Sequence, residues 1–192
     1  MVAVCRAHFL LLTALCLLTP GSAHAQVLAG VPWPVRPAVV IDGAASDPRV
    51  LLVHAAVAHW NQILAGIGSG FRLGPVSVGG SAGIGKIQVV LSDGEFISNA
   101  RRFADGRGAV VMIRNQNGPP MSLPNVPRNV IAHELGHAIG LGHNSDPALL
   151  MCGRPAPCRP AVFTSSTAHY FPLSGEERAK LLAMYPANWK SQ

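Results

Sequence analysis

The segment from His133 to His143 constrains this chain more than any other, because it combines three histidines, a glutamate and a glycine at fixed spacing. It reads H-E-x-x-H-x-x-G-x-x-H, and the defined positions are His133, Glu134, His137, Gly140 and His143. On a helix, His133 and His137 would stand on one face, about 5–6 Å apart at their Cβ atoms. Gly140 tolerates the left-handed conformation that ends helices. The chain can therefore turn back after Gly140 and bring His143 to the other two.

Three imidazoles in this arrangement suit a single zinc ion, since histidine nitrogen is one of the usual zinc ligands. Three protein ligands leave a fourth position for water, which is the arrangement of catalytic rather than structural zinc. Glu134 follows the first histidine and can reach a water molecule at that fourth position. The alternative is a helix with two surface histidines followed by a glycine-rich turn.

The same segment and the residues after it resemble the metzincin metallopeptidases, and most of all the matrixin branch. Met151 corresponds to the methionine that lies beneath the zinc ligands in that family, and residues 173–186 resemble the family's C-terminal helix. The resemblance is close over residues 133–151 and loose over residues 33–185. It implies an α+β, metzincin-like zincin fold, with a twisted mixed sheet, two long helices and a small C-terminal subdomain that holds one helix.

The chain also departs from the matrixin pattern. Asn144 stands where matrixins usually have serine, and Cys152 and Gly153 stand where they often have tyrosine and proline. No pro-segment with a cysteine switch is visible, and no stretch matches the family's loop for a structural zinc and calcium ions. We therefore expect one catalytic Zn²⁺ ion, whereas calcium has no supporting motif.

Residues 1–25 have the features of a secretory signal peptide. They contain an arginine near the start, an apolar run at residues 9–18, and the small residues Ala23 and Ala25 before a cleavage site. The apolar run is too short to span a membrane. We expect residues 26–192 to form a single catalytic domain that is secreted to the periplasm or the exterior and does not stay inserted in a membrane.

The chain has four cysteines, and two of them lie in the predicted signal peptide. Cys152 and Cys158 remain, and a close pair in an exported chain indicates a disulfide. This disulfide would close a small loop directly after Met151 and stiffen the wall of the cleft. The alternative is a pair of additional metal ligands, although two cysteines alone make an incomplete metal site.

The formal net charge is +6, and the arginines that produce it are scattered along the chain. Nucleic-acid binding would need clustered basic residues with interleaved aromatic residues. We therefore expect no nucleic-acid partner. We also expect a monomer that acts on a protein or peptide substrate.

Apolar periodicity predicts the remaining elements. Strands are expected at residues 33–42, 71–78 (broken at Gly74 and Pro75), 86–92 and 108–114, and a polar loop at 93–108. A helix is expected from Asp47, as N-cap, to Gly66. Its apolar stripe consists of Val50, Val53, Val57, Trp60 and Leu64.

Three further expectations concern the later part of the chain. Asn125 or Asn129 is the candidate cap of the helix that carries the motif. Ser174 and Glu177 have the spacing of a capping box that opens the last helix. Tyr170, in the segment that follows the methionine turn, is a candidate donor to a developing oxyanion, and the alternative is an ordinary loop residue.

The strand at 108–114, or the loop before it, is the candidate to border the cleft and pair with an extended substrate. Together these features predict a secreted zinc-dependent endopeptidase that hydrolyses peptide bonds with a zinc-bound water and Glu134 as general base. The alternative is a catalytically silent secreted binding protein with the same zinc fold, against which the retained Glu134 and the open coordination position argue. Hydrolysis of a non-peptide amide at the same site is a third hypothesis.

Overall fold

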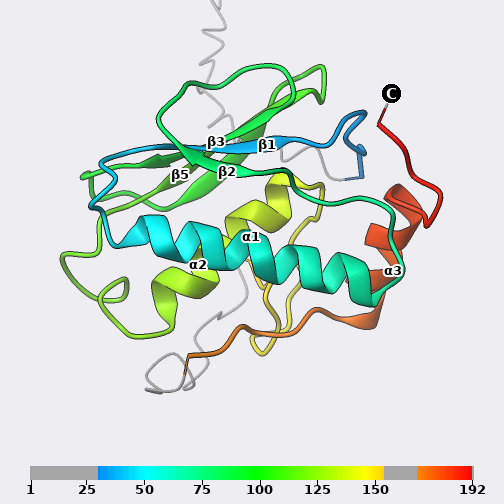
Figure 1. Ribbon diagram of the computed structural model, residues 1–192. Coiled ribbons are helices and arrows are strands. Elements are labelled where there is room, and N and C mark those ends of the chain that lie inside the picture. The colour runs from blue at the N-terminus through cyan, green and yellow to red at the C-terminus, as the bar shows by residue number, and fades with distance from the viewer. Residues whose placement is uncertain (1–29, 154–167, 192) are drawn as a thin grey trace, which may run out of the picture.

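The computed structural model describes residues 30–153 and 168–191 (Figure 1). The predicted signal peptide at residues 1–25 and Cys158 lie outside the described residues, so the signal peptide and the Cys152–Cys158 disulfide stay predictions. The elements are, in chain order, β1 (Ala38–Asp42), α1 (Arg49–Gly66), β2 (Val76–Val78), β3 (Lys86–Leu91), β4 (Asn99–Arg102), β5 (Gly108–Ile113), α2 (Val126–Ala138) and α3 (Gly175–Met184). Within the described ranges, no helix has the length and apolar character needed to cross a membrane.

The five strands form one sheet in the order β2-β1-β3-β5-β4. All neighbours pair in parallel except β4, which runs antiparallel to β5. The predicted combination of a mixed sheet with helices is therefore confirmed, and the sheet is mostly parallel. Helices α1 and α2 lie together beneath the sheet in Figure 1, and α2 contacts both β4 and β5. The edge strand β4 thus lies beside the helix that carries the histidine motif.

Helix α1 packs with the apolar stripe that its sequence predicts. Val53, Trp60 and Leu64 are fully buried, whereas Leu51, which is outside the stripe, is 74% exposed. The Trp60 indole Nε1 donates to the Ala132 carbonyl of α2 at 2.9 Å. Apolar packing and this hydrogen bond together fix α2 against α1.

Helix α1 begins one residue later than predicted, with Pro48 in the N-cap position. Asp47 still accepts a hydrogen bond from the Arg49 backbone N–H at 2.8 Å, and it forms an ion pair with the Arg49 guanidinium. Arg49 is buried and donates to the carbonyls of Ser92 at 2.7 Å and Arg114 at 2.9 Å. These carbonyls directly follow β3 and β5, so Arg49 attaches the start of α1 to the ends of two central strands.

All four predicted strands are shorter than predicted: β3 and β5 each end one residue early, and β1 and β2 begin several residues late. β1 begins directly after Pro37 and β2 directly after Pro75. Proline has no backbone N–H to donate to a neighbouring strand, which is why each ladder starts only after the proline.

Strand β4 lies inside the segment 93–108, so the prediction of a continuous polar loop was wrong there. The cause is Arg102, a charged residue at an inward position that is only 4% exposed. Its guanidinium donates to the carbonyls of Val31 and Gly106 and lies 5.0 Å from the centre of the Trp33 ring. An arginine at a buried position hides the alternation of apolar and polar residues that identifies a strand.

The C-terminal end of α2 is held by residues from both ends of the chain. The Trp33 indole Nε1 donates to the Ala138 carbonyl at 2.8 Å, and the Tyr185 hydroxyl donates to the Ile139 carbonyl at 2.9 Å. The last carbonyls of a helix have no partner within the helix. Trp33 and Tyr185 supply those partners, and so fix the direction in which the chain leaves α2.

The contact between Asp47 and Arg49 predicts a pH-dependent stability. Hydrogen bonding to Arg49 lowers the pKa of Asp47 below its ordinary value of 3.8. A pKa that is lower in the folded state than in the unfolded state stabilises the fold at pH values above the unfolded-state pKa. This stabilisation is lost as the pH falls through the folded-state pKa. Asp47→Asn should therefore cost about 1–3 kcal/mol of unfolding free energy at pH 7, and this cost should shrink as the pH falls below 3.8.

Urea unfolding of the wild type and the variant at pH 7, 5 and 3 measures this difference. Asp42→Asn, at an exposed carboxylate, is the matched control and should change stability little at any of these pH values. A cost of Asp47→Asn that stays the same from pH 7 to pH 3 would contradict the prediction.

Candidate metal centre

The end of α2 determines where the third histidine lies. Gly140 has a φ of +104°, which is the left-handed region that the sequence requires of it. The N–H of Gly140 donates to the His137 carbonyl and the N–H of Leu141 donates to the Gly136 carbonyl, both at 3.0 Å. This pair of bonds is the Schellman pattern, which ends a helix and reverses the chain. The reversed chain brings His143 back beside α2.

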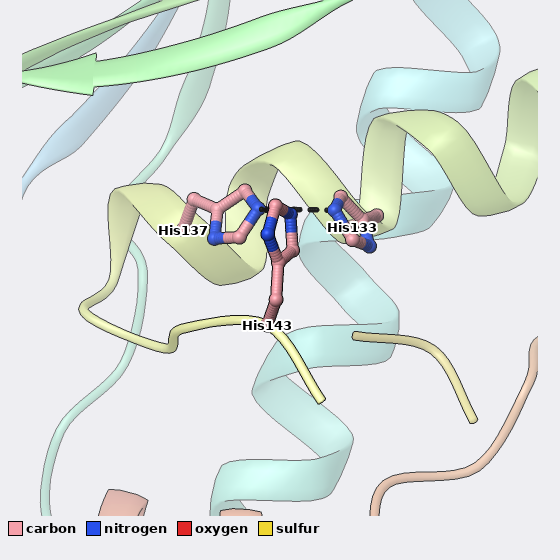
Figure 2. Close-up of side chains that lie close together, drawn as sticks. All are labelled: His133, His137 and His143. Carbon is pink, nitrogen blue, oxygen red and sulfur yellow. Dashed lines mark hydrogen bonds between the residues drawn. The ribbon is translucent and has the colours of Figure 1, made fainter. Parts of the chain in front are cut away.

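The three histidines of the motif converge (Figure 2). The Nε2 atom of His137 lies 3.0 Å from Nε2 of His133 and 2.9 Å from Nε2 of His143, and the three ligand atoms lie within 4.8 Å of one another. A tetrahedral zinc ion with bonds of about 2.0–2.1 Å separates two ligand nitrogens by about 3.3 Å. The cluster therefore has the size that one zinc ion requires, and the predicted ligands are the residues that the structure brings together.

Two backbone carbonyls determine which ring nitrogens face the centre. His133 Nδ1 lies 2.7 Å from the Leu150 carbonyl, and His137 Nδ1 lies 2.8 Å from the Leu141 carbonyl. Because a carbonyl only accepts, each Nδ1 carries the proton and each Nε2 presents a lone pair. Burial lowers the pKa of His133 to about 4 and that of His137 to about 3, so both rings are neutral at pH 7.

This protonation pattern makes the contact between His133 Nε2 and His137 Nε2 a contact between two acceptors. Two lone pairs at 3.0 Å repel one another unless a cation lies between them. Neutral imidazoles with their second nitrogen bonded to a carbonyl are the form in which histidine binds zinc. The donor set thus fits Zn²⁺ in number, spacing and protonation.

Glu134, next to the first histidine, is only 6% exposed. Its carboxylate has no hydrogen-bond partner or ion-pair partner among the described residues. Burial raises the pKa of Glu134 to about 8, because the charged form is poorly solvated there. A buried carboxyl group without a partner, on the residue next to His133 in the chain, is a second observation that favours a cation in this place.

Met151 is fully buried and packs closely against α2. A Cβ atom at Gly136 would lie 2.5 Å from the Met151 sulfur and 3.0 Å from Trp60, so a larger residue here would force these side chains to move. The residue before the methionine, Leu150, supplies the carbonyl that orients His133 and donates its own N–H to the Pro172 carbonyl at 2.9 Å.

Gly153 has a functional position that sequence reasoning missed. In the sequence it is only a departure from the matrixin pattern, yet a Cβ atom at Gly153 would lie 2.0 Å from Cγ of His143. The His143 ring therefore lies directly against the Gly153 backbone. Nothing local in the sequence indicates this contact, since the two residues meet only after the chain has turned at residues 144–151.

The two candidate caps of α2 have a different use from the one predicted. Asn125 is at the N-cap position but makes no side-chain cap hydrogen bond. Its Oδ1 accepts from the His169 N–H at 3.1 Å, and Asn129 Oδ1 accepts from the Phe171 N–H at 2.8 Å. The two asparagines thus hold the segment that precedes α3 along the first turns of α2.

Tyr170 lies in this segment, and its ring packs on α1. It stacks on His59 with ring centres 3.9 Å apart, and the Arg128 guanidinium lies 5.2 Å from the ring centre. Burial raises the pKa of Tyr170. These contacts are made with α1 and α2 side chains outside the histidine cluster, and they give no support to Tyr170 as an oxyanion donor.

Comparisons with known proteins identify the fold. The sequence matches no model of a known protein family and no curated protein. Among solved structures, the chain resembles archaemetzincin from Methanopyrus kandleri, with a TM-score of 0.50 and 12% sequence identity over 79% of this chain and 96% of that one. A likeness at this identity establishes a shared zincin-like fold, whereas the chemistry has to be argued from the site itself.

The contact between Gly153 and His143 predicts that Gly153→Ala weakens metal binding. The added methyl group has to displace the His143 ring, so we expect zinc affinity to fall by about 10–100-fold, the range seen when support of a ligand is lost. A competition titration with a chromogenic chelator measures the affinity. Gly175→Ala is the control, because a Cβ atom at Gly175 meets no other atom within 4 Å. Equal affinity in both variants would show that Gly153 does not support His143.

Proposed function

We propose that the chain is a secreted zinc-dependent endopeptidase of the metzincin type. The observation that carries the proposal is the convergence of three Nε2 atoms. Glu134, the residue directly after the first of these histidines in the chain, adds a buried carboxyl group without a partner among the described residues. A site built only to hold a structural ion would close the fourth coordination position with another ligand, and the cluster of described residues contains three. The likeness to archaemetzincin supports the same class of protein.

His133, His137 and His143 would hold the metal. When bound, zinc lowers the pKa of a water molecule and polarises a carbonyl group. Glu134 then acts through its carboxylate: it accepts the proton of the attacking water and returns it to the nitrogen of the leaving amine. Burial raises the pKa of Glu134, whereas a nearby cation would lower it, so the two effects oppose one another.

Strand β4 supports a peptide as the substrate. It is the last strand of the sheet and lies beside α2, and within the described sheet it pairs only with β5. An extended peptide can add to such an edge through backbone hydrogen bonds. Of the two candidates for the strand that borders the cleft, this favours the segment 93–108, which contains β4, over the strand that follows it.

Export and membership of the matrixin branch are proposed from the sequence alone. Residues 1–25 support export, and residue 151 with the segment 173–177 supports the matrixin branch. We further propose one zinc ion for each chain and action as a monomer.

Replacement of Glu134 by glutamine tests its role as general base. The neutral amide has almost the same shape but cannot take a proton, so Glu134→Gln should bind zinc like the wild type and lose about 10²–10⁴-fold in the rate of casein cleavage. Zinc content by atomic absorption and cleavage of a fluorescent casein measure the two properties. A variant that retains zinc and cleaves casein at the wild-type rate would exclude this role.

Metal removal tests the metal site independently of turnover. Zinc at about 100 times its dissociation constant should stabilise the metal-free protein by about 2.7 kcal/mol, because only the folded state assembles the three ligands. His143→Ala should lose this stabilisation, whereas His54→Ala, at an exposed position of α1, should keep it. Thermal unfolding with and without zinc measures the effect.

Casein cleavage in the same samples separates the enzyme from a silent zinc-binding protein. The proposal expects cleavage that stops with a chelator and returns with zinc. Stabilisation by zinc without any cleavage would favour the silent binding protein.

A further inference from the structure

Asn144, directly after the third histidine, uses all of its polar groups to connect separate segments. Its N–H donates to the Met151 carbonyl at 2.9 Å, and its carbonyl accepts from the Gly153 N–H at 3.0 Å. Its Oδ1 accepts from the Asp146 N–H at 2.9 Å, and its Nδ2 donates to Glu177 Oε1 at 2.6 Å. The backbone that carries His143 is therefore fixed to the methionine segment on one side and to α3 on the other.

Glu177 is the α3 end of this connection. It is 6% exposed, and within the described ranges no lysine or arginine pairs with it. Its Oε2 accepts from the Ser174 N–H at 2.7 Å, and the Ser174 hydroxyl accepts from the Glu177 N–H at 3.0 Å, which confirms the predicted capping box. A capping box needs only one carboxylate oxygen, and the second one binds Asn144.

His143 depends on this support more than the other two histidines do. The rings of His133 and His137 are oriented by backbone carbonyls, whereas Nδ1 of His143 has no hydrogen-bond partner among the described residues. His143 is also the exposed member of the cluster. What remains to position its ring is the Gly153 backbone beneath it and the fixed backbone of Asn144.

We propose that Glu177 is a positioning residue of the metal centre: through Asn144 it holds the backbone that presents His143, so that α3 contributes to metal affinity. This inference rests on the proposed zinc site and adds a residue of α3, distant in sequence, to it. A residue that only capped α3 would affect the stability of that helix and leave metal binding unchanged.

The hydrogen bonds allow an exchange experiment. In Glu177→Gln the capping box can persist, because glutamine is also accepted in that motif. However, the NH₂ group of the new glutamine then has to face a donor, either the Asn144 Nδ2 group or the Ser174 backbone N–H. In Asn144→Asp two carboxylates meet at the contact that is now 2.6 Å long. The double variant Asn144→Asp/Glu177→Gln restores every bond, since the new amide donates to Asp and accepts from Ser174.

Zinc affinity by chelator competition is the main measurement, made on the whole protein. Each single variant should bind zinc about 10–100-fold more weakly, and the double variant should return to within about threefold of the wild type. The control is Glu176→Gln. This exposed carboxylate on the same helix pairs with Lys180 among the described residues, and the variant should bind zinc like the wild type. The visible absorption spectrum of the Co²⁺-loaded protein gives a second readout, which should change in the single variants and recover in the double variant.

Wild-type affinity in Glu177→Gln, or a loss that the double variant does not reverse, would overturn the inference. If a single variant fails to fold, recovery of folding and of zinc affinity together in the double variant supports it, and recovery of folding with weak zinc binding overturns it. These results are distinguishable from failure of the proposed function. A wild type that binds no zinc overturns both, whereas a wild type that binds zinc and cleaves no casein overturns only the peptidase.

Discussion

The metal centre depends on two hydrogen bonds, from His133 Nδ1 to the Leu150 carbonyl and from His137 Nδ1 to the Leu141 carbonyl. They place both Nε2 lone pairs in the centre and keep the rings from rotating away. The two carbonyl groups are held in position by different parts of the chain. Leu141 is in place because the left-handed Gly140 ends α2 at that point, and Leu150 is in place because its N–H bonds to Pro172. The tautomer of two histidines therefore depends on the path of the chain over a much longer stretch.

Close packing around α2 also helps to fix the positions of the three histidines. Gly136 lets Met151 and Trp60 approach α2 so closely that a methyl group would collide with both, and Gly153 does the same beneath the His143 ring. A densely packed interior resists small displacements. A site held in this way is largely formed before a ligand binds, and binding then costs little conformational entropy. The one ligand that this packing leaves exposed is His143, which is where the connection to α3 becomes important.

The sequence could predict those features that arise from local spacing. His133 and His137 are one helical turn apart, Gly140 ends the helix, the apolar stripe of α1 is periodic, and Ser174 and Glu177 form a capping box. The sequence could not predict features in which a polar side chain forms hydrogen bonds with residues far away in the chain. Arg102 is buried against Val31 and Gly106 and so concealed strand β4, and Asn125 and Asn129 bind the segment before α3 rather than cap their own helix. The bond between Asn144 and Glu177 joins residues 33 positions apart, and only the folded chain brings them together.

X-ray absorption at the zinc edge tests the central claim most directly, because it reports the type and number of atoms bound to the metal. For the protein loaded with one equivalent of zinc, the account predicts three imidazole nitrogens at about 2.0–2.1 Å and one further light atom that is not imidazole. His143→Ala should reduce the imidazole count to two. A sulfur ligand, or two imidazoles in the wild type and no change in the variant, would contradict the assignment of His133, His137 and His143 as the zinc ligands.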